Sequence, residues 1–303
     1  MAVRIAAYIG GTMFKRIIVA TDLSPASLAV ANCLGGLKAY GAKHCLLMQC
    51  LSLQEAASVG LSYSSEILHE ALREQKEAIE KQGFTVETRI VPGFAMQELN
   101  RAALEENYQL IVVGTIKRSL TSEAFMGGIT ADIIHSAKTP VLILRIEAKS
   151  GEVRQCHKAG PCDFSRHVLF PTDFSENADN AFVYVEKLAA AGAKNITLIH
   201  VQDKSKIDPH LKSRLEEFNR IDRERLEELK GKLAKKGKAE IKIALAYGSP
   251  AVEIMKFALE KKPDLIVMGS QGRGFVKELF LGSVSQNVAR HADADVLLVP
   301  ANR

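Results

Sequence analysis

The chain of 303 residues lacks the features that would place it in a membrane or on a nucleic acid. No apolar run approaches the 18 or so residues that a membrane-spanning helix needs. The formal net charge of +5 is small, and Lys and Arg are interspersed with Asp and Glu rather than gathered in a basic block. We therefore expect a soluble protein that requires neither a membrane nor a nucleic acid as partner.

Cysteine is scarce as well, and five residues are too few for a disulfide framework in a chain of this length. Three of them fall in apolar segments, where a buried thiol packs as a small hydrophobic side chain: Cys33, Cys45 and Cys50. Cys156, His157 and Cys162 lie in a polar segment and offer three ligands for a soft metal, but no fourth ligand is near, so we predict no metal site. A reducing, cytoplasmic setting fits this pattern best.

The sequence reads as one pattern of strands and helices written twice. Each half opens with a β-rich run that ends in Thr-Asp-x-Ser, and Ser24 (followed by Pro25) and Ser175 are predicted helix N-caps. In the first half we expect strands at 16–20, 44–51, 85–91, 111–114 and 140–145, with helices at 25–40, 65–82, 95–107 and before the last strand. In the second half we expect strands at 167–171, 196–201, 239–246, 265–268 and 295–299, with helices at 176–191, 209–236, 251–261 and from Gly282.

Strands that alternate with helices of ten or more residues predict an α/β fold with two similar, doubly wound, five-stranded parallel-sheet domains. We place an N-terminal extension at 1–12, the first domain at 13–148, a linker at 149–163 and the second domain at 164–303. The long helix near 209–236 carries an apolar side that should cover the sheet: Leu211, Leu215, Phe218, Leu226, Leu229 and Leu233.

A glycine loop follows a buried strand in the second half. Gly269 and Gly272 come directly after Leu265–Met268, where a missing β-carbon lets backbone amides approach an anion. Nine residues later Gly282-Ser283 opens a helix, whose unpaired amides and dipole favour the same anion. The alternative is that Ser283 and Gln286 form a capping box and the glycines only make loops. The strand, the glycines and an Asp at the end of the first strand together favour a nucleotide site.

These residues resemble the universal stress protein family, through Gly269-x2-Gly272-x9-Gly282-Ser283 and Thr172-Asp173-Phe-Ser, as a tandem pair over nearly the whole chain. The resemblance implies the universal stress protein fold, which is adenine nucleotide alpha hydrolase-like, and ATP as ligand. It implies a nucleoside side made of Pro171, Asp173 and Val201. It implies a phosphate side made of Met268, Gly269, Gln271, Gly272, Gly282, Ser283, Val284 and Ser285. A carboxylate such as Asp173 can accept a hydrogen bond from a ribose hydroxyl, whereas Arg273 and Lys277 are interpreted as solvated surface residues.

The first half departs from this pattern, because Lys117 stands at the second glycine and Gly128 at the serine. A lysine β-carbon disfavours any left-handed backbone that the loop needs. Four residues of the pattern are nevertheless retained: Asp22, Gly114, Gly127 and Thr130. We therefore expect the second domain to be the main nucleotide site.

The resemblance therefore implies a stress regulator that binds ATP, with or without Mg or Mn, and acts through conformation or an unknown protein partner, and we expect it to be cytoplasmic. ADP or AMP is an alternative ligand. No catalytic base is evident, His200 is interpreted as a packed strand residue, and the Walker lysine motif is absent, so we do not expect an enzyme. The rival hypotheses are a slow ATP-hydrolysing enzyme, an adenylate-forming ligase, and an interaction protein without nucleotide. Two such domains could pair as a pseudo-dimer within the chain, and a homodimer stays open.

Overall fold

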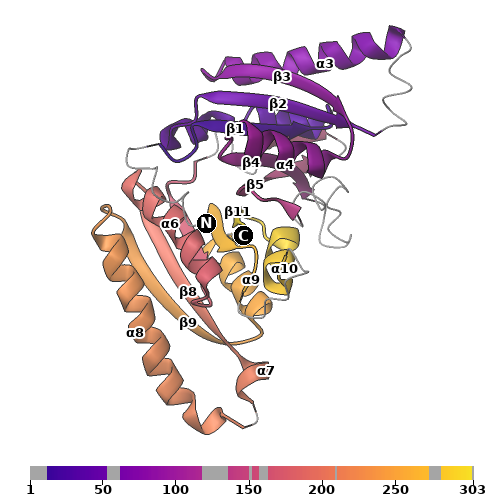
Figure 1. Cartoon of the computed structure of the whole chain (residues 1–303). Helices are drawn as coiled ribbons and strands as arrows, with labels where there is room; N and C mark the ends of the chain where they lie inside the picture. Colours follow the sequence, from indigo (N-terminus) through magenta and orange to yellow (C-terminus); the bar gives the residue numbers. More distant parts are fainter. Residues whose placement is uncertain are drawn as a thin grey trace. The chain divides into compact units, whose positions relative to one another are not determined.

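Two α/β units, residues 1–162 and 163–303, make up the chain in the computed structural model (Figure 1). The structure describes residues 12–52, 62–117, 136–149, 152–156, 163–208, 210–272 and 281–301. The extension predicted at 1–12 lies almost entirely outside these residues. The domain and linker bounds given above remain a proposal for how the chain divides.

The first unit is a parallel sheet with one antiparallel strand at its edge. Its strands are β1 (Arg16–Thr21), β2 (His44–Leu51), β3 (Thr85–Pro92), β4 (Leu110–Lys117), β5 (Val141–Lys149) and β6 (Glu152–Cys156). Its helices are α1 (Pro25–Ala31), the 3-10 helix η1 (Leu34–Tyr40), α3 (Ser62–Glu80) and α4 (Ala95–Glu105). The order within the unit is β3-β2-β1-β4-β5, and β6 pairs antiparallel with β5.

The second unit repeats this order as β9-β8-β7-β10-β11, and all its strand pairs are parallel. Its strands are β7 (His167–Pro171), β8 (Asn195–Asp203), β9 (Glu240–Gly248), β10 (Leu265–Gly269) and β11 (Asp295–Val299). Its helices are α6 (Glu176–Ala190), α7 (Lys204–Ile207), η2 (Lys212–Arg214), α8 (Leu215–Ala234), α9 (Pro250–Lys261) and α10 (Ser283–His291).

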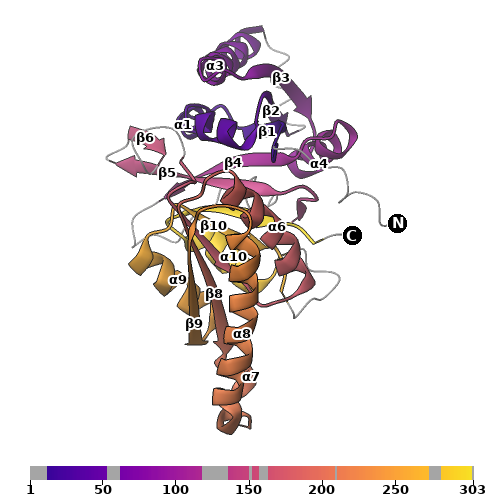
Figure 2. The ribbon, with the colours of Figure 1, turned by 90° about the vertical axis from the view of Figure 1, so that its left-hand side faces the viewer.

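Helices pack on both faces of the second sheet, which confirms the doubly wound α/β prediction. Helices α6 and α8 contact each other and the sheet, whereas α9 and α10 form a second contacting pair (Figure 2). The strand order reverses between β7 and β10, and in open α/β sheets such a switch point, at the carboxyl ends of the strands, is where ligands bind. The fold therefore directs attention to the residues that follow these two strands.

The first helix is shorter than predicted. Ser24 is its N-cap and Pro25 its first residue, as expected, but the α-helix ends at Ala31 and the chain continues as a 3-10 helix to Tyr40. The Gln82 side chain donates to the Ala31 carbonyl at 2.7 Å and accepts from Gly35 N at 2.6 Å. This side chain, which follows the end of α3, takes the place of helical hydrogen bonds at the end of α1. Local sequence could not reveal this contact. The helix expected between Gly127 and the last strand lies mostly outside the described residues.

Strand β6 occupies part of the segment that we interpreted as linker. Glu147 of β5 faces Arg154 of β6, with a register shift beside Ile146. Alternation of apolar and polar residues is weak in β6, so the sequence offered little sign of it. After β5, the last of the five parallel strands, the chain therefore turns back and pairs with β5 as β6.

The cysteines differ from the prediction at one position. Cys45 and Cys50 are free, and burial raises the pKa of both thiols, that of Cys50 to about 11 with a contribution from Glu98. Cys33, predicted as a packed thiol, is instead disulfide-bonded. Which cysteines pair cannot be deduced from their spacing in the sequence alone. The side chain of Cys156, and His157 and Cys162 entirely, lie outside the described part of the chain.

No group of His, Cys, Asp and Glu side chains in the described ranges could hold a metal ion. None of the helices described is long and apolar enough to cross a membrane.

Helix α8 covers the sheet with only part of its predicted apolar side. Leu226, Leu229 and Leu233 are buried, whereas Leu211, which precedes the helix, is 39% exposed. The segment predicted as one helix is divided into α7, η2 and α8. The prediction of a covering helix is therefore confirmed for its second half.

Candidate functional site

The turn after β7 presents an aspartate at the switch point. Asp173 Oδ1 accepts hydrogen bonds from Ser175 N at 3.1 Å and Ser175 Oγ at 2.6 Å, while Thr172 Oγ1 accepts from Phe174 N at 3.0 Å. Phe174 has a φ of 57°, a left-handed conformation that is costly for a bulky residue and that these hydrogen bonds hold. Ser175 also accepts from Ala178 N as the N-cap of α6, as predicted.

The second carboxylate oxygen of Asp173 faces the glycine loop after β10. A β-carbon placed on Gly272 would lie 2.7 Å from Asp173 Oδ2. On Gly269 it would lie 2.7 Å from Asn177 Nδ2 and 3.0 Å from the Asn177 carbonyl oxygen. Gly269 therefore lets α6 approach the strand, and Gly272 lets the Asp173 carboxylate approach the glycine loop.

The start of α10 meets the same loop. Gly282 is the N-cap without a side-chain capping hydrogen bond, and its N–H donates to the Ser270 carbonyl at 2.7 Å. A β-carbon on Gly282 would lie 3.6 Å from Gly272 N. The expected convergence of the glycine loop and the helix N-terminus is therefore present, and the alternative capping box with Ser283 as N-cap is wrong because Ser283 is already the first helical residue.

The remaining predicted site residues either belong to the first turn of α10 or have buried side chains near the ends of the strands. Ser285 Oγ donates to the Gly269 carbonyl at 2.8 Å and braces the loop from α10. Ser283 is exposed and Val284 is half-buried at the start of the same helix. The other predicted residues have buried side chains: Pro171, Val201, Met268 and Gln271. Arg273 and Lys277 lie outside the described residues.

The expected reason for glycine at the second loop position needs correction. The sequence suggests that a β-carbon, as in Lys117, would disfavour a left-handed backbone there, but Gly272 is not among the described residues with positive φ. Glycine is needed instead because a β-carbon would press on the Asp173 carboxylate. The constraint is a close approach between two segments, which the local sequence does not show.

The first unit repeats the turn but not the loop. Asp22 accepts from Ser24 and Ser27; burial acts to raise its pKa, but these hydrogen bonds outweigh it and the net pKa is lowered. Beyond Gly114, β4 continues as a strand to Lys117, which pairs with Glu147 of β5. The chain therefore makes no turn where β10 ends in the second unit. Gly127, Gly128 and Thr130 lie outside the described residues.

One residue of the site was missed by sequence reasoning. Asn177, in the first turn of α6, is 8% exposed, and its Nδ2 donates to the Gln271 carbonyl at 3.1 Å. Its buried Oδ1 has no hydrogen-bond partner within the described ranges. A polar residue two positions after a predicted N-cap was the available signal. This carbonyl oxygen is an acceptor at the junction of α6 and the loop.

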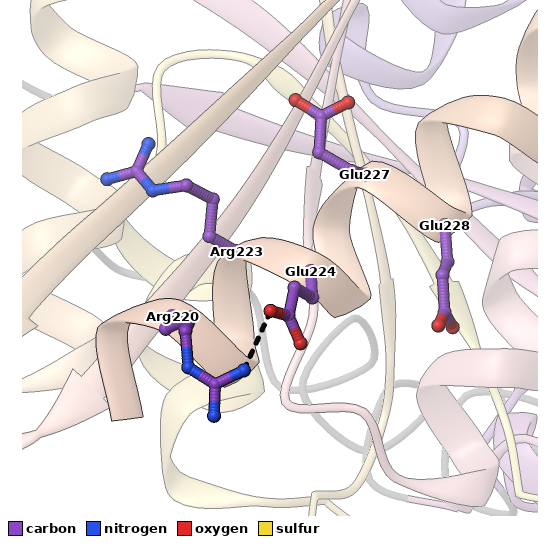
Figure 3. A pocket seen from close by; sticks show the side chains of 5 residues that line it. All are labelled: Arg220, Arg223, Glu224, Glu227 and Glu228. Atoms are coloured by element: carbon purple, nitrogen blue, oxygen red, sulfur yellow. Dashed lines mark hydrogen bonds and ion pairs between the residues drawn. The ribbon is translucent and has the colours of Figure 1, made fainter. Parts of the chain in front are cut away.

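A hollow lies away from this site, along α8 (Figure 3). Arg220 donates to Glu224 at 2.9 Å, and the remaining lining residues come from the same helix: Arg223, Glu227 and Glu228. Both members of the pair are exposed, and ion pairs of this kind contribute about 0–1 kcal/mol. This hollow is a solvated helix face rather than a site at the switch point.

Comparisons with known proteins agree with this architecture. The model of the universal stress protein family matches residues 13–145 and 165–300. A universal stress protein of Methanocaldococcus jannaschii is 33% identical over 152 residues, which cover 44% of this chain and 94% of that protein. A universal stress protein of Thermus aquaticus is 32% identical over 139 residues, with 44% and 96% covered.

A crystal structure matches both units together. It is a universal stress protein from Archaeoglobus fulgidus, 25% identical, with a TM-score of 0.71 over 94% of this chain and 97% of that one. The likeness thus extends to the tandem arrangement of the chain.

Proposed function

The chain belongs to the universal stress protein family, and on this premise we propose that it binds an adenine nucleotide, ATP foremost, in its second unit. The bound nucleotide would act in a stress response by changing conformation or partner choice. ADP and AMP are the alternative ligands. A cytoplasmic location belongs to the proposal, and the disulfide bond of Cys33 removes the cysteine pattern as an argument for it. Pairing of the two units, a homodimer and a protein partner belong to the proposal as well.

One observation carries the proposal: Asp173 Oδ2 faces the side of Gly272 that lacks a β-carbon, and Gly282 lies against the same residue. A carboxylate, open backbone and an uncapped helix start meet there at the switch point. A ribose hydroxyl can donate to the carboxylate, while phosphate oxygens can accept from backbone amides. A nucleotide needs both groups close together, because its ribose needs an acceptor and its phosphates need donors.

The residues present fit such a ligand. Asp173 would hold the ribose, and the amides of the Gly272 loop and of the first turn of α10 would hold phosphates. The buried Asn177 Oδ1 supplies a further acceptor for a hydroxyl or amino group. Val201 and Pro171 would line the nucleoside side with little exposed surface. A divalent cation such as Mg or Mn would neutralise phosphate charge if it accompanies the nucleotide.

We favour a binder over an enzyme. His200 is the one residue that the sequence suggested as a possible catalytic base. It is 7% exposed and its Nδ1 lies 2.7 Å from the Thr172 carbonyl oxygen, so it is packed as predicted. Slow hydrolysis is the alternative, and release of phosphate from ATP under single-turnover conditions separates the two. An interaction protein without nucleotide is the other alternative.

Thermal unfolding tests the proposal. Saturating ATP should raise the melting temperature of the nucleotide-stripped chain, because a ligand at 100 times its Kd stabilises the folded state by about 2.7 kcal/mol. GTP at the same concentration should have a smaller effect, and inorganic phosphate the smallest. Equal shifts with all three would indicate non-specific anion binding, and no shift with any adenine nucleotide would favour the interaction protein.

A further inference from the structure

The turn that carries Asp173 also contacts helix α8. Asp173 faces Gly272, but the next residue, Phe174, lies among side chains of other elements. Its ring centroid is 4.7 Å from that of His200 in β8, and the guanidinium of Arg225 in α8 lies 4.4 Å from the Phe174 centroid. A cation at this distance from an aromatic ring is attracted to the negative face of the ring. Phe174 therefore joins the turn to α8.

His200 provides a second connection between the same elements. A carbonyl oxygen can only accept, so His200 Nδ1, 2.7 Å from the Thr172 carbonyl, must carry a proton and donate it. On the other side of the ring, Nε2 lies 3.6 Å from Asp222 Oδ2 of α8. Gln202 Nε2 donates to the same oxygen at 2.9 Å, and Arg225 lies 3.8 Å from the other one. Two series of contacts thus connect α8 to the turn, one through Arg225 and Phe174 and the other through Asp222 and His200.

Among its described residues, the first unit has neither series of contacts at the matching positions. In the register of β1 and β2, Gln49 pairs with Thr21 and so stands where His200 stands beside Thr172. Leu23 takes the place of Phe174 and has the same φ of 57°. Thr21 Oγ1 donates instead to Gln75 of α3 at 2.7 Å, a neutral contact. The charged and aromatic connection occurs in the unit that has the glycine loop.

We propose that Phe174, His200 and Arg225 are positioning residues that hold the Thr172–Ser175 turn in the conformation that presents Asp173, so that nucleotide occupancy is coupled to helix α8. This inference rests on the proposed function. Such coupling is reciprocal. If bound nucleotide favours the observed position of α8 by a given factor, a change that displaces α8 lowers nucleotide affinity by the same factor. Helix α8 runs beside β8 and β9 (Figure 1), and none of its residues is a predicted nucleotide contact.

Hydrogen exchange on the full chain, with and without saturating ATP, tests the coupling. In the wild-type protein, ATP should slow amide exchange in 265–272 and also, at least threefold, in 218–226 of α8. Arg225→Met should weaken ATP binding about fivefold and abolish the protection of α8 while that of 265–272 persists at saturation. Arg225→Lys keeps the cation and should retain the protection. If Arg225 only stabilised the fold, its replacement would not remove the ATP-dependent protection of α8.

Arg220→Met is the matched control, because Arg220 lies on the same helix but pairs outward with Glu224. It should change neither ATP affinity nor protection of α8. Phe174→Leu introduces the residue found at the matching position of the first unit, Leu23, and should have the same effects as Arg225→Met. If this variant fails to fold, the test rests on Arg225→Met, because Arg225 is more exposed. Protection of 265–272 without protection of 218–226 in the wild-type protein would overturn the coupling alone. No protection anywhere would overturn the proposed function and the coupling with it.

Discussion

Asp173→Ala is expected to weaken binding of ATP about ten- to a hundredfold. The carboxylate lies against the side of Gly272 that lacks a β-carbon, and a hydrogen bond to a charged group contributes about 1.5–3 kcal/mol. Every 1.4 kcal/mol changes the dissociation constant tenfold. Equilibrium titration of the nucleotide-stripped variant measures the loss.

The first unit supplies the matched control for this substitution. Asp22 occupies the same Thr-Asp-x-Ser turn and accepts hydrogen bonds from Ser24 and Ser27, but it has no glycine loop beside it in the described residues. Asp22→Ala removes an equivalent turn contact and should leave ATP affinity unchanged. If both variants lose affinity equally, the loss reflects damage to the turns in general rather than a ligand contact. If Asp173→Ala binds as the wild type does, Asp173 is not a ligand contact.

Gly272→Lys is expected to weaken ATP binding at least tenfold, about 1.4 kcal/mol. The substitution copies Lys117 of the first unit into the glycine loop. Its β-carbon would lie 2.7 Å from Asp173 Oδ2, so the carboxylate must move out of the position that Ser175 fixes. Calorimetry on the folded variant measures the change.

Two alanine variants separate the causes. Gly272→Ala adds the β-carbon without the ammonium group and should account for most of the loss; a loss seen with lysine alone would contradict the steric explanation. Gly231→Ala, in α8, adds a β-carbon that meets nothing within 4 Å. It should leave binding unchanged and stabilise the helix by about 0.5–1 kcal/mol.

Much of the fold could be predicted from local patterns. Strands β2 and β11 have the predicted bounds, because short apolar runs between turn residues mark buried parallel strands. Both N-caps followed from serine before a helical run. The convergence of Gly272 and Gly282 followed from the rule that strand ends of a doubly wound sheet share one edge.

The parts that escaped prediction all depend on contacts between distant residues. Gln82 donates to the last residue of α1 from a position after α3, and the disulfide bond of Cys33 could not be deduced from cysteine spacing. Asn177 and Arg225 contact the glycine loop and the Asp173 turn from helices, which no spacing in the sequence specifies. Even the reason for Gly272 is of this kind, since it depends on where Asp173 lies rather than on backbone conformation.

Calorimetric titration of ATP into the purified, nucleotide-stripped chain, with magnesium present, tests the central claim most directly, because it reports affinity and stoichiometry together. We predict one site per chain, which Asp173→Ala weakens and Asp22→Ala does not. Two sites per chain would show that the first unit binds despite the strand at Lys117. No heat, together with no nucleotide released from the freshly purified protein on denaturation, would contradict the account and favour an interaction protein.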